Sequence, residues 1–241
     1  MKNIFILIIL SLFISNTVIW ANDTYQVYDY NNYTPHNLCK NEKILFIMDY
    51  SNSMNEFIGD NRKIELMRET IKNIVHSINP DTEIGLRVYG YKLGFSPYEC
   101  CRASKLVVPI YSNNATNISE AIYKTKARGM TPITYSLKKA VEKDFIGFSG
   151  KKHIILLSDG GENCDESPCE YVMKNLAKRK DFTVDVIAFN VNNHEDINQL
   201  KCVSAVTSGK FYTANTKGEL INALNNTLQV RKDVGGFIVE H

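Results

Sequence analysis

The sequence feature that most limits the possible folds is a pair of short segments made entirely of apolar residues. Residues 44–48 read ILFIM, and residues 154–157 read IILL. A strand with one face in water would alternate apolar and polar side chains. A continuous apolar run instead indicates a strand that is buried on both faces, as in the middle of a parallel sheet covered by helices.

Strand and helix patterns alternate along the rest of the chain. Apolar residues recur at helical spacing between positions 64 and 78, for example, and Pro80 follows the end of that pattern. Pro109 places its own strand at a sheet edge. Such alternation predicts an α/β fold, a doubly wound and mostly parallel six-stranded sheet with helices on both faces. The predicted strands are residues 44–48, 83–89, 106–110, 153–157, 183–189 and 211–213, and the predicted helices are residues 64–78, 118–127, 132–145, 196–206, 220–230 and a segment beginning at Pro168.

A cluster of oxygen-bearing side chains follows the first of these strands. Asp49, Ser51 and Ser53 form a D-x-S-x-S pattern directly after residues 44–48. Ligands of open α/β sheets bind outside the carboxyl ends of the strands, which is where this pattern would lie. A carboxylate and two hydroxyls that converge on one point suit a hard divalent cation such as Mg²⁺.

This stretch resembles the metal-ion-dependent adhesion site (MIDAS) of von Willebrand factor type A (VWA) domains. The site of that family also needs a Thr and an Asp from distant loops. Thr131, in the GMTPI segment, and Asp159, after the second apolar run, stand in the corresponding order and context. The resemblance covers roughly residues 42–230 and implies the Rossmann-like VWA fold, with one antiparallel edge strand at residues 106–110. The segments GLRVYGY, SDGGENCDESPCE and LKCVSAVTSGKFY are similar to exported bacterial members.

Each of these residues also has an ordinary structural interpretation. Ser51 and Ser53 could be helix caps or turn residues. Thr131 could cap a helix that has Pro132 at its first position, and Asp159 begins a common Asp-Gly turn. Their joint occurrence at the ends of two buried strands and at a helix start favours the metal site.

The resemblance implies how the metal centre would work. The hydroxyls of Ser51, Ser53 and Thr131 would bind the cation directly, and Asp49 and Asp159 would act mainly through bridging waters. The cation would then lack a direct carboxylate from its own domain and would accept a Glu or Asp from a partner. This predicts an exported adhesion or assembly module that binds a protein ligand presenting an acidic residue. Mg²⁺ is the expected ion, with Ca²⁺ or Mn²⁺ as alternatives.

The main alternative is a metal-dependent hydrolase, a phosphatase of the haloacid-dehalogenase type that uses Asp49. Those enzymes need a second Asp two residues later as general acid, and here that position is Ser51. No Ser-His-Asp set is readable from the five histidines, and there is no G-x-x-x-x-G-K-[ST] phosphate loop. A redox or structural module is a third class, indicated only by the cysteines. We therefore expect a binding protein without catalytic residues.

The N-terminus has the pattern of an export signal. Met1-Lys2-Asn3 precedes an apolar run of about twelve residues, and Ala21 offers a cleavage site. We expect a signal peptide at 1–21, an Asn- and Tyr-rich extension at 22–42, the VWA domain at 43–232 and a tail at 233–241. The expected location is periplasmic or secreted, and an uncleaved membrane anchor is the alternative. The formal net charge of +2 does not favour nucleic acid as a partner.

Six cysteines in an exported chain predict disulfides, and the sequence leaves fifteen connectivities open. Cys164 and Cys169 lie close together in the loop beside the metal site, so they are the expected pair. The sequence does not pair Cys39, Cys100, Cys101 and Cys202. A zinc site is the alternative, although no paired C-x-x-C spacing supports it.

Overall fold

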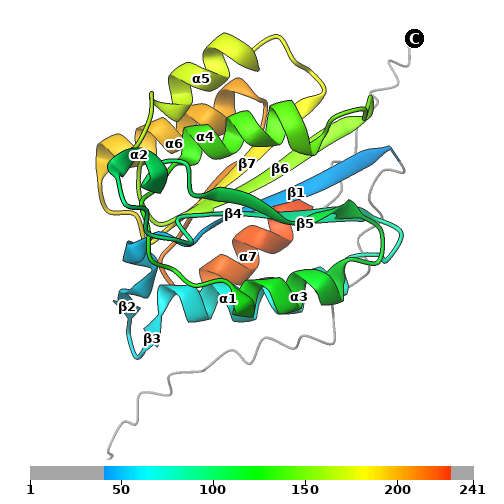
Figure 1. Ribbon diagram of the computed structural model, residues 1–241. Coiled ribbons are helices and arrows are strands. Elements are labelled where there is room, and N and C mark those ends of the chain that lie inside the picture. The colour runs from blue at the N-terminus through cyan, green and yellow to red at the C-terminus, as the bar shows by residue number, and fades with distance from the viewer. Residues whose placement is uncertain (1–40, 229–241) are drawn as a thin grey trace, which may run out of the picture. The chain divides into compact units, whose positions relative to one another are not determined.

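The computed structural model describes residues 41–228, and its centre is a six-stranded sheet with β1 in the interior (Figure 1). The strand order is β5-β4-β1-β6-β7-β8. All neighbours are parallel except β4 and β5, which are antiparallel. The predicted fold class and its antiparallel edge strand are confirmed. The strands are β1 (Glu42–Asp49), β4 (Glu83–Tyr89), β5 (Ser104–Tyr111), β6 (Lys151–Ser158), β7 (Phe182–Phe189) and β8 (Phe211–Ala214).

Two helical layers cover the sheet, and β1 supplies side chains to the hydrophobic core on both sides. Ile44, Phe46 and Met48 pack in one core, whereas Leu45 and Ile47 pack in the other. This is the physical reason for the unbroken apolar run. One layer holds α1 (Lys63–Ser77), α3 (Ala115–Lys124) and α7 (Lys217–Leu228), and the other holds α4 (Ile133–Lys139), α5 (Pro168–Asn175) and α6 (His194–Val206) (Figure 1).

Pro109 lies in the edge strand β5, as predicted. The pairing of β4 with β5 is irregular here, because Ile84 pairs with Tyr111 while Leu86 pairs with Val108. Pro109 therefore falls in the irregular stretch, where its missing N–H does not interrupt the sheet ladder.

The helix predicted over residues 132–145 is shorter in the structure. Helix α4 begins at Ile133 and ends at Lys139, and a π-helical turn, η3 (Ala140–Asp144), follows it. The Arg87 guanidinium binds both carboxylate oxygens of Asp144, at 2.6 and 2.7 Å, and this buried ion pair holds the widened turn against β4. The helix predicted at residues 118–127 corresponds to α3, which begins and ends three residues earlier.

Several short elements were not among those predicted from the sequence. They are the 3₁₀ turn η2 (Asn52–Asn55), the hairpin strands β2 (Phe57–Ile58) and β3 (Asn61–Arg62), and α2 (Pro97–Cys100) in the loop between β4 and β5.

The expected signal peptide, nearly all of the extension and the C-terminal tail lie outside the described residues. Among residues 41–228, no helix combines the length and apolar character needed to cross a membrane.

Candidate metal centre

Asp49 is the last residue of β1 and is fully buried. Its Oδ1 accepts a hydrogen bond from the Ser51 backbone N–H at 2.7 Å. Its Oδ2 accepts hydrogen bonds from the hydroxyls of Tyr89 and Ser158, both at 2.9 Å. Asp49 therefore fixes the turn that follows β1 from within the protein, and its carboxylate does not face solvent.

The side-chain oxygens of Ser51, Ser53 and Asp159 converge next to this turn. The two serine Oγ atoms are 2.9 Å apart. Asp159 Oδ1 accepts hydrogen bonds from Ser53 Oγ at 2.7 Å and from Ser51 Oγ at 3.5 Å. Oxygen ligands of this kind suit hard divalent cations. Within residues 41–228 no group of three or more His, Cys, Asp or Glu side chains could by itself hold a metal ion.

The site holds two buried carboxylates close together. Burial, followed by the negative charge of Asp159, raises the pKa of Asp49 to about 7. A bound divalent cation would offset both effects, since it would supply the positive charge that these carboxylates lack.

Lys63 also contacts the site, and this contact was not predicted from the sequence. Its ammonium lies 3.0 Å from Asp159 Oδ2 and 2.8 Å from Glu56 Oε2. Burial alone would lower the pKa of Lys63, but its hydrogen bond to Glu56 and the charge of Asp159 outweigh burial and raise it. The residue reads in sequence as an ordinary charged position at a helix start, so no pattern marked it.

Two glycines bring the segment that carries Thr131 next to Ser51. Ser51 forms a parallel β-bridge with Gly129, whose carbonyl accepts the Asn52 N–H at 2.9 Å. A Cβ at Gly129 would lie 2.6 Å from a backbone oxygen of the β4–β5 loop. Gly90 has a φ of +69°, and a Cβ there would lie 2.6 Å from the Ser51 nitrogen. This close backbone approach therefore requires glycine at both positions.

Thr131 is buried two residues beyond Gly129, and it does not cap a helix. Pro132 occupies the N-cap position of α4, with a ψ of 68°, and no side chain of that residue or of Thr131 bonds the first turn. The capping interpretation is therefore wrong. Within residues 41–228, the Thr131 backbone N–H bonds Asn163, whereas no hydrogen bond of its hydroxyl is seen.

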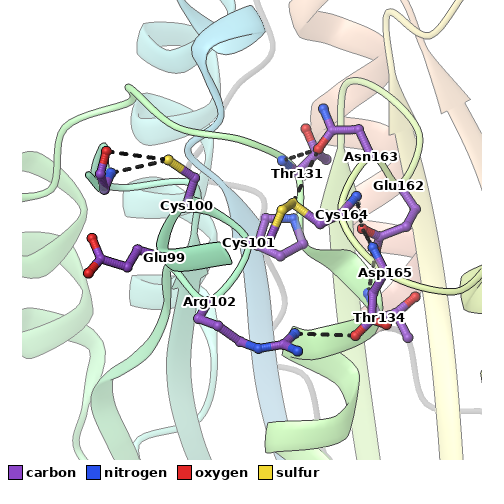
Figure 2. The surroundings of a disulfide bond; sticks show 12 residues. Glu99, Cys100, Cys101, Arg102, Thr131, Thr134, Glu162, Asn163, Cys164 and Asp165 are labelled. Atoms are coloured by element: carbon purple, nitrogen blue, oxygen red, sulfur yellow. Dashed lines mark hydrogen bonds and ion pairs between the residues drawn. A yellow bond between two sulfur atoms is a disulfide. The ribbon is translucent and has the colours of Figure 1, made fainter. Parts of the chain in front are cut away.

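A loop after β6 performs the capping instead and holds Thr131 in place. Glu162 Oε2 accepts the Thr134 N–H of the first turn of α4 at 2.6 Å. Asn163 Oδ1 accepts the Thr131 N–H at 2.8 Å, as Figure 2 shows. The polar residues of the ENCDES segment (162–167) indicate a loop. Nothing in the sequence indicated that this loop would bond residues 28 to 32 positions earlier in the chain.

The predicted Cys164–Cys169 disulfide is wrong. Cys101 pairs with Cys164, and Cys169 pairs with Cys202. Cys169 lies in the first turn of α5, which packs against α6, where Cys202 is found. Cys164 lies in the preceding loop and reaches the β4–β5 loop (Figure 2). Cys100 is the one free cysteine of residues 41–228, and Cys39 lies outside them. The two disulfides leave no cysteine cluster for the alternative zinc site among these residues.

The molecule is thus a doubly wound α/β domain with polar loops gathered at the carboxyl ends of its central strands. The family model of the von Willebrand factor type A domain matches residues 43–227, and the chain belongs to this family.

The chain also has a relative of similar sequence, and solved structures share its fold. The chain is 27% identical to the uncharacterized protein YwmD of Bacillus subtilis (strain 168) over 194 residues, which are 77% of this chain and 84% of that protein. Proximal thread matrix protein 1 of the mussel byssus, in a structure with a zinc-occupied MIDAS motif, superposes with a TM-score of 0.59 at 20% identity. That match covers 81% of this chain and 46% of the mussel chain, so this chain spans less than half of that protein. A von Willebrand factor type A structure from Catenulispora acidiphila has a TM-score of 0.59 at 17% identity, over 78% of this chain and 42% of that chain.

Proposed function

We propose that this protein is an exported, metal-dependent protein-binding module. Ser51, Ser53 and Thr131 would bind a divalent cation through their hydroxyls, and Asp159, which accepts the two serine hydroxyls, would orient them and hold a bound water. Asp49 would act from behind the site by fixing the turn that carries the serines, because its oxygens accept the Ser51 N–H and the Tyr89 and Ser158 hydroxyls. The observation that carries this proposal is the convergence of the Ser51, Ser53 and Asp159 oxygens at the ends of β1 and β6.

The donor set supports Mg²⁺ as the resident ion. All five proposed residues offer oxygen, and Mg²⁺ and Ca²⁺ both prefer oxygen ligands. The hydroxyl-rich shell leaves coordination positions for water, which suits the reluctance of Mg²⁺ to lose its hydration. The zinc-occupied MIDAS motif of the mussel protein shows a metal in a protein of the same fold, and Mn²⁺ would fit the same ligands.

The charge of the site supports a carboxylate as the partner's ligand. Asp159 is paired with Lys63, so its negative charge is already partly neutralised. A divalent cation would then retain an excess of positive charge, which favours an additional anionic oxygen. A Glu or Asp side chain of a partner protein would supply that oxygen and link the two proteins through the metal.

The environment of Asp49 supports binding rather than phosphatase chemistry. A nucleophilic carboxylate needs an oxygen that can reach the substrate. Asp49 is fully buried and both of its oxygens accept hydrogen bonds from the protein. Ser51 occupies the position where the phosphatase would need its general acid.

Export is supported by the cysteines. Two disulfides are typical of an oxidising compartment such as the periplasm or the cell exterior. The signal peptide at 1–21 remains a prediction.

Calorimetric titration with Mg²⁺ tests the metal site. A Ser51→Ala/Ser53→Ala variant should lose most Mg²⁺ affinity, because two of the three proposed direct ligands are removed. Ser136→Ala is the matched control: this buried serine of α4 bonds Ser104 and the Pro132 carbonyl, and its loss should leave Mg²⁺ binding unchanged. Wild-type Mg²⁺ affinity in the double variant would refute the site.

Capture from the exported protein pool of the same cells then tests the partner. Proteins that bind in Mg²⁺ and are released by a chelator should be retained by wild type and by Ser136→Ala, but not by the double variant. Equal capture with and without the chelator would argue against a metal bridge.

A further inference from the structure

Lys63 occupies a position that is unfavourable for a lysine. It is 4% exposed, and lysine is almost never so deeply buried unless it is paired. It is also the first residue of α1, where the positive end of the helix dipole disfavours a cation. Local conflicts of this kind are expected at functional sites.

The two oxygens of Asp159 divide between Lys63 and the serine hydroxyls. Oδ2 lies 3.0 Å from the Lys63 ammonium, and both side chains are buried. Oδ1 accepts the Ser53 hydroxyl and faces the proposed metal ligands. Lys63 therefore both orients the carboxylate and neutralises part of its charge from the side away from the ligands.

We propose that Lys63 weakens the domain's own hold on the divalent cation, so that a partner carboxylate is needed for tight binding. This inference rests on the proposed metal site and concerns its affinity. Glu56 also binds Lys63 but is largely exposed, so only the buried groups are counted: with Asp49 and Asp159 ionised, the two carboxylates and the Lys63 ammonium sum to one negative charge. Without it they sum to two, in a buried setting where charges interact more strongly than in water.

The test is a calorimetric titration of the purified protein with Mn²⁺ in the absence of any partner. Lys63→Met keeps much of the side-chain volume and removes the charge, so Mn²⁺ should bind at least tenfold more tightly than to wild type. Lys63→Arg keeps the charge and should bind Mn²⁺ with nearly the wild-type affinity.

Lys152→Met is the matched control for the removal of a buried ammonium. Lys152 is also 4% exposed and lies 2.9 Å from Asp181, but it stands at the start of β6, whereas Asp159 follows the end of that strand. This variant should lose thermal stability and leave Mn²⁺ affinity unchanged.

Thermal melting keeps the test decisive if Lys63→Met folds poorly on its own. Mn²⁺ should then raise its melting temperature by more than it raises that of wild type, because the ion would neutralise the carboxylates left unpaired. Equal or weaker Mn²⁺ binding by Lys63→Met, or an equal or smaller rise in its melting temperature, would overturn the inference and make Lys63 purely structural. If wild type itself binds no Mn²⁺, the proposed function fails and not this inference alone.

Discussion

Breaking the Cys101–Cys164 disulfide should affect both stability and metal binding, whereas breaking the other disulfide should affect stability alone. The relevant perturbation is the double variant Cys101→Ser/Cys164→Ser. Both residues are replaced because a lone Cys164 could pair with the neighbouring free thiol of Cys100. Cys169→Ser/Cys202→Ser is the matched control.

The expected loss of stability follows from the lengths of the closed loops. The two bonds join residues 63 and 33 positions apart. Loop-closure entropy gives about 4 kcal/mol for either loop, and because the dependence on length is logarithmic the two differ by only about half a kcal/mol. Measured values for disulfides are typically about 2–4 kcal/mol. The two variants should therefore unfold at similarly reduced urea concentrations.

Metal affinity should separate the two variants. Cys164 adjoins Asn163, whose Oδ1 holds the Thr131 N–H at 2.8 Å. If freeing the loop costs this hydrogen bond, about 1 kcal/mol of positioning energy is lost, which corresponds to about fivefold weaker binding. Cys169 and Cys202 join α5 to α6 and have no such contact with the Thr131 segment.

Urea unfolding and Mg²⁺ calorimetry on both variants and wild type provide the measurements. The reasoning would be refuted if the two variants lost Mg²⁺ affinity equally, or if the Cys101/Cys164 variant kept the wild-type affinity while its stability fell.

Three further substitutions test single features of the site and the core. Thr131→Val keeps the volume of this buried side chain and removes its hydroxyl, so it should weaken Mg²⁺ binding and change the unfolding free energy by less than about 0.5 kcal/mol, because the hydroxyl caps nothing; a loss of about 1 kcal/mol in melting or urea curves would restore the capping role. Asp144→Ala should cost about 3–5 kcal/mol in urea unfolding and leave Mg²⁺ affinity intact, since Arg87 would keep a buried, unpaired charge; a neutral effect would contradict this. Gly90→Ala should lower both stability and Mg²⁺ affinity, because its Cβ would lie 2.6 Å from the Ser51 nitrogen at a φ of +69°, and wild-type values in both assays would show that the loop can give way.

The structure also changes what an Asp49 variant would report. A metal-site residue at a strand end and outside the core could be replaced by Ala without affecting the fold, but Asp49 does not lie outside the core. It is instead fully buried and accepts the hydroxyls of Tyr89 and Ser158. Its removal would leave buried donors unpaired, so lost metal binding in that variant would be mixed with lost stability.

The local sequence pattern was sufficient to predict the sheet and the part of the metal site that follows β1. The run at residues 44–48 predicts burial on both faces, because adjacent side chains of a strand point to opposite sides and every one is apolar. Pro109 marks the edge strand, because it lacks the N–H that an inner strand must donate. Asp49, Ser51 and Ser53 follow one strand, so their proximity needs no knowledge of the tertiary fold.

Contacts between loops were decided only by the tertiary structure. Thr131 and Asp159 were assigned through the resemblance to VWA domains, and Lys63 was not assigned at all. Cys164 bonds Cys101 rather than the nearby Cys169, because α5 directs Cys169 toward α6 while the preceding loop faces the β4–β5 loop. Periodicity records which face of its own element a residue occupies, whereas these pairings depend on how separate loops meet at the end of the sheet.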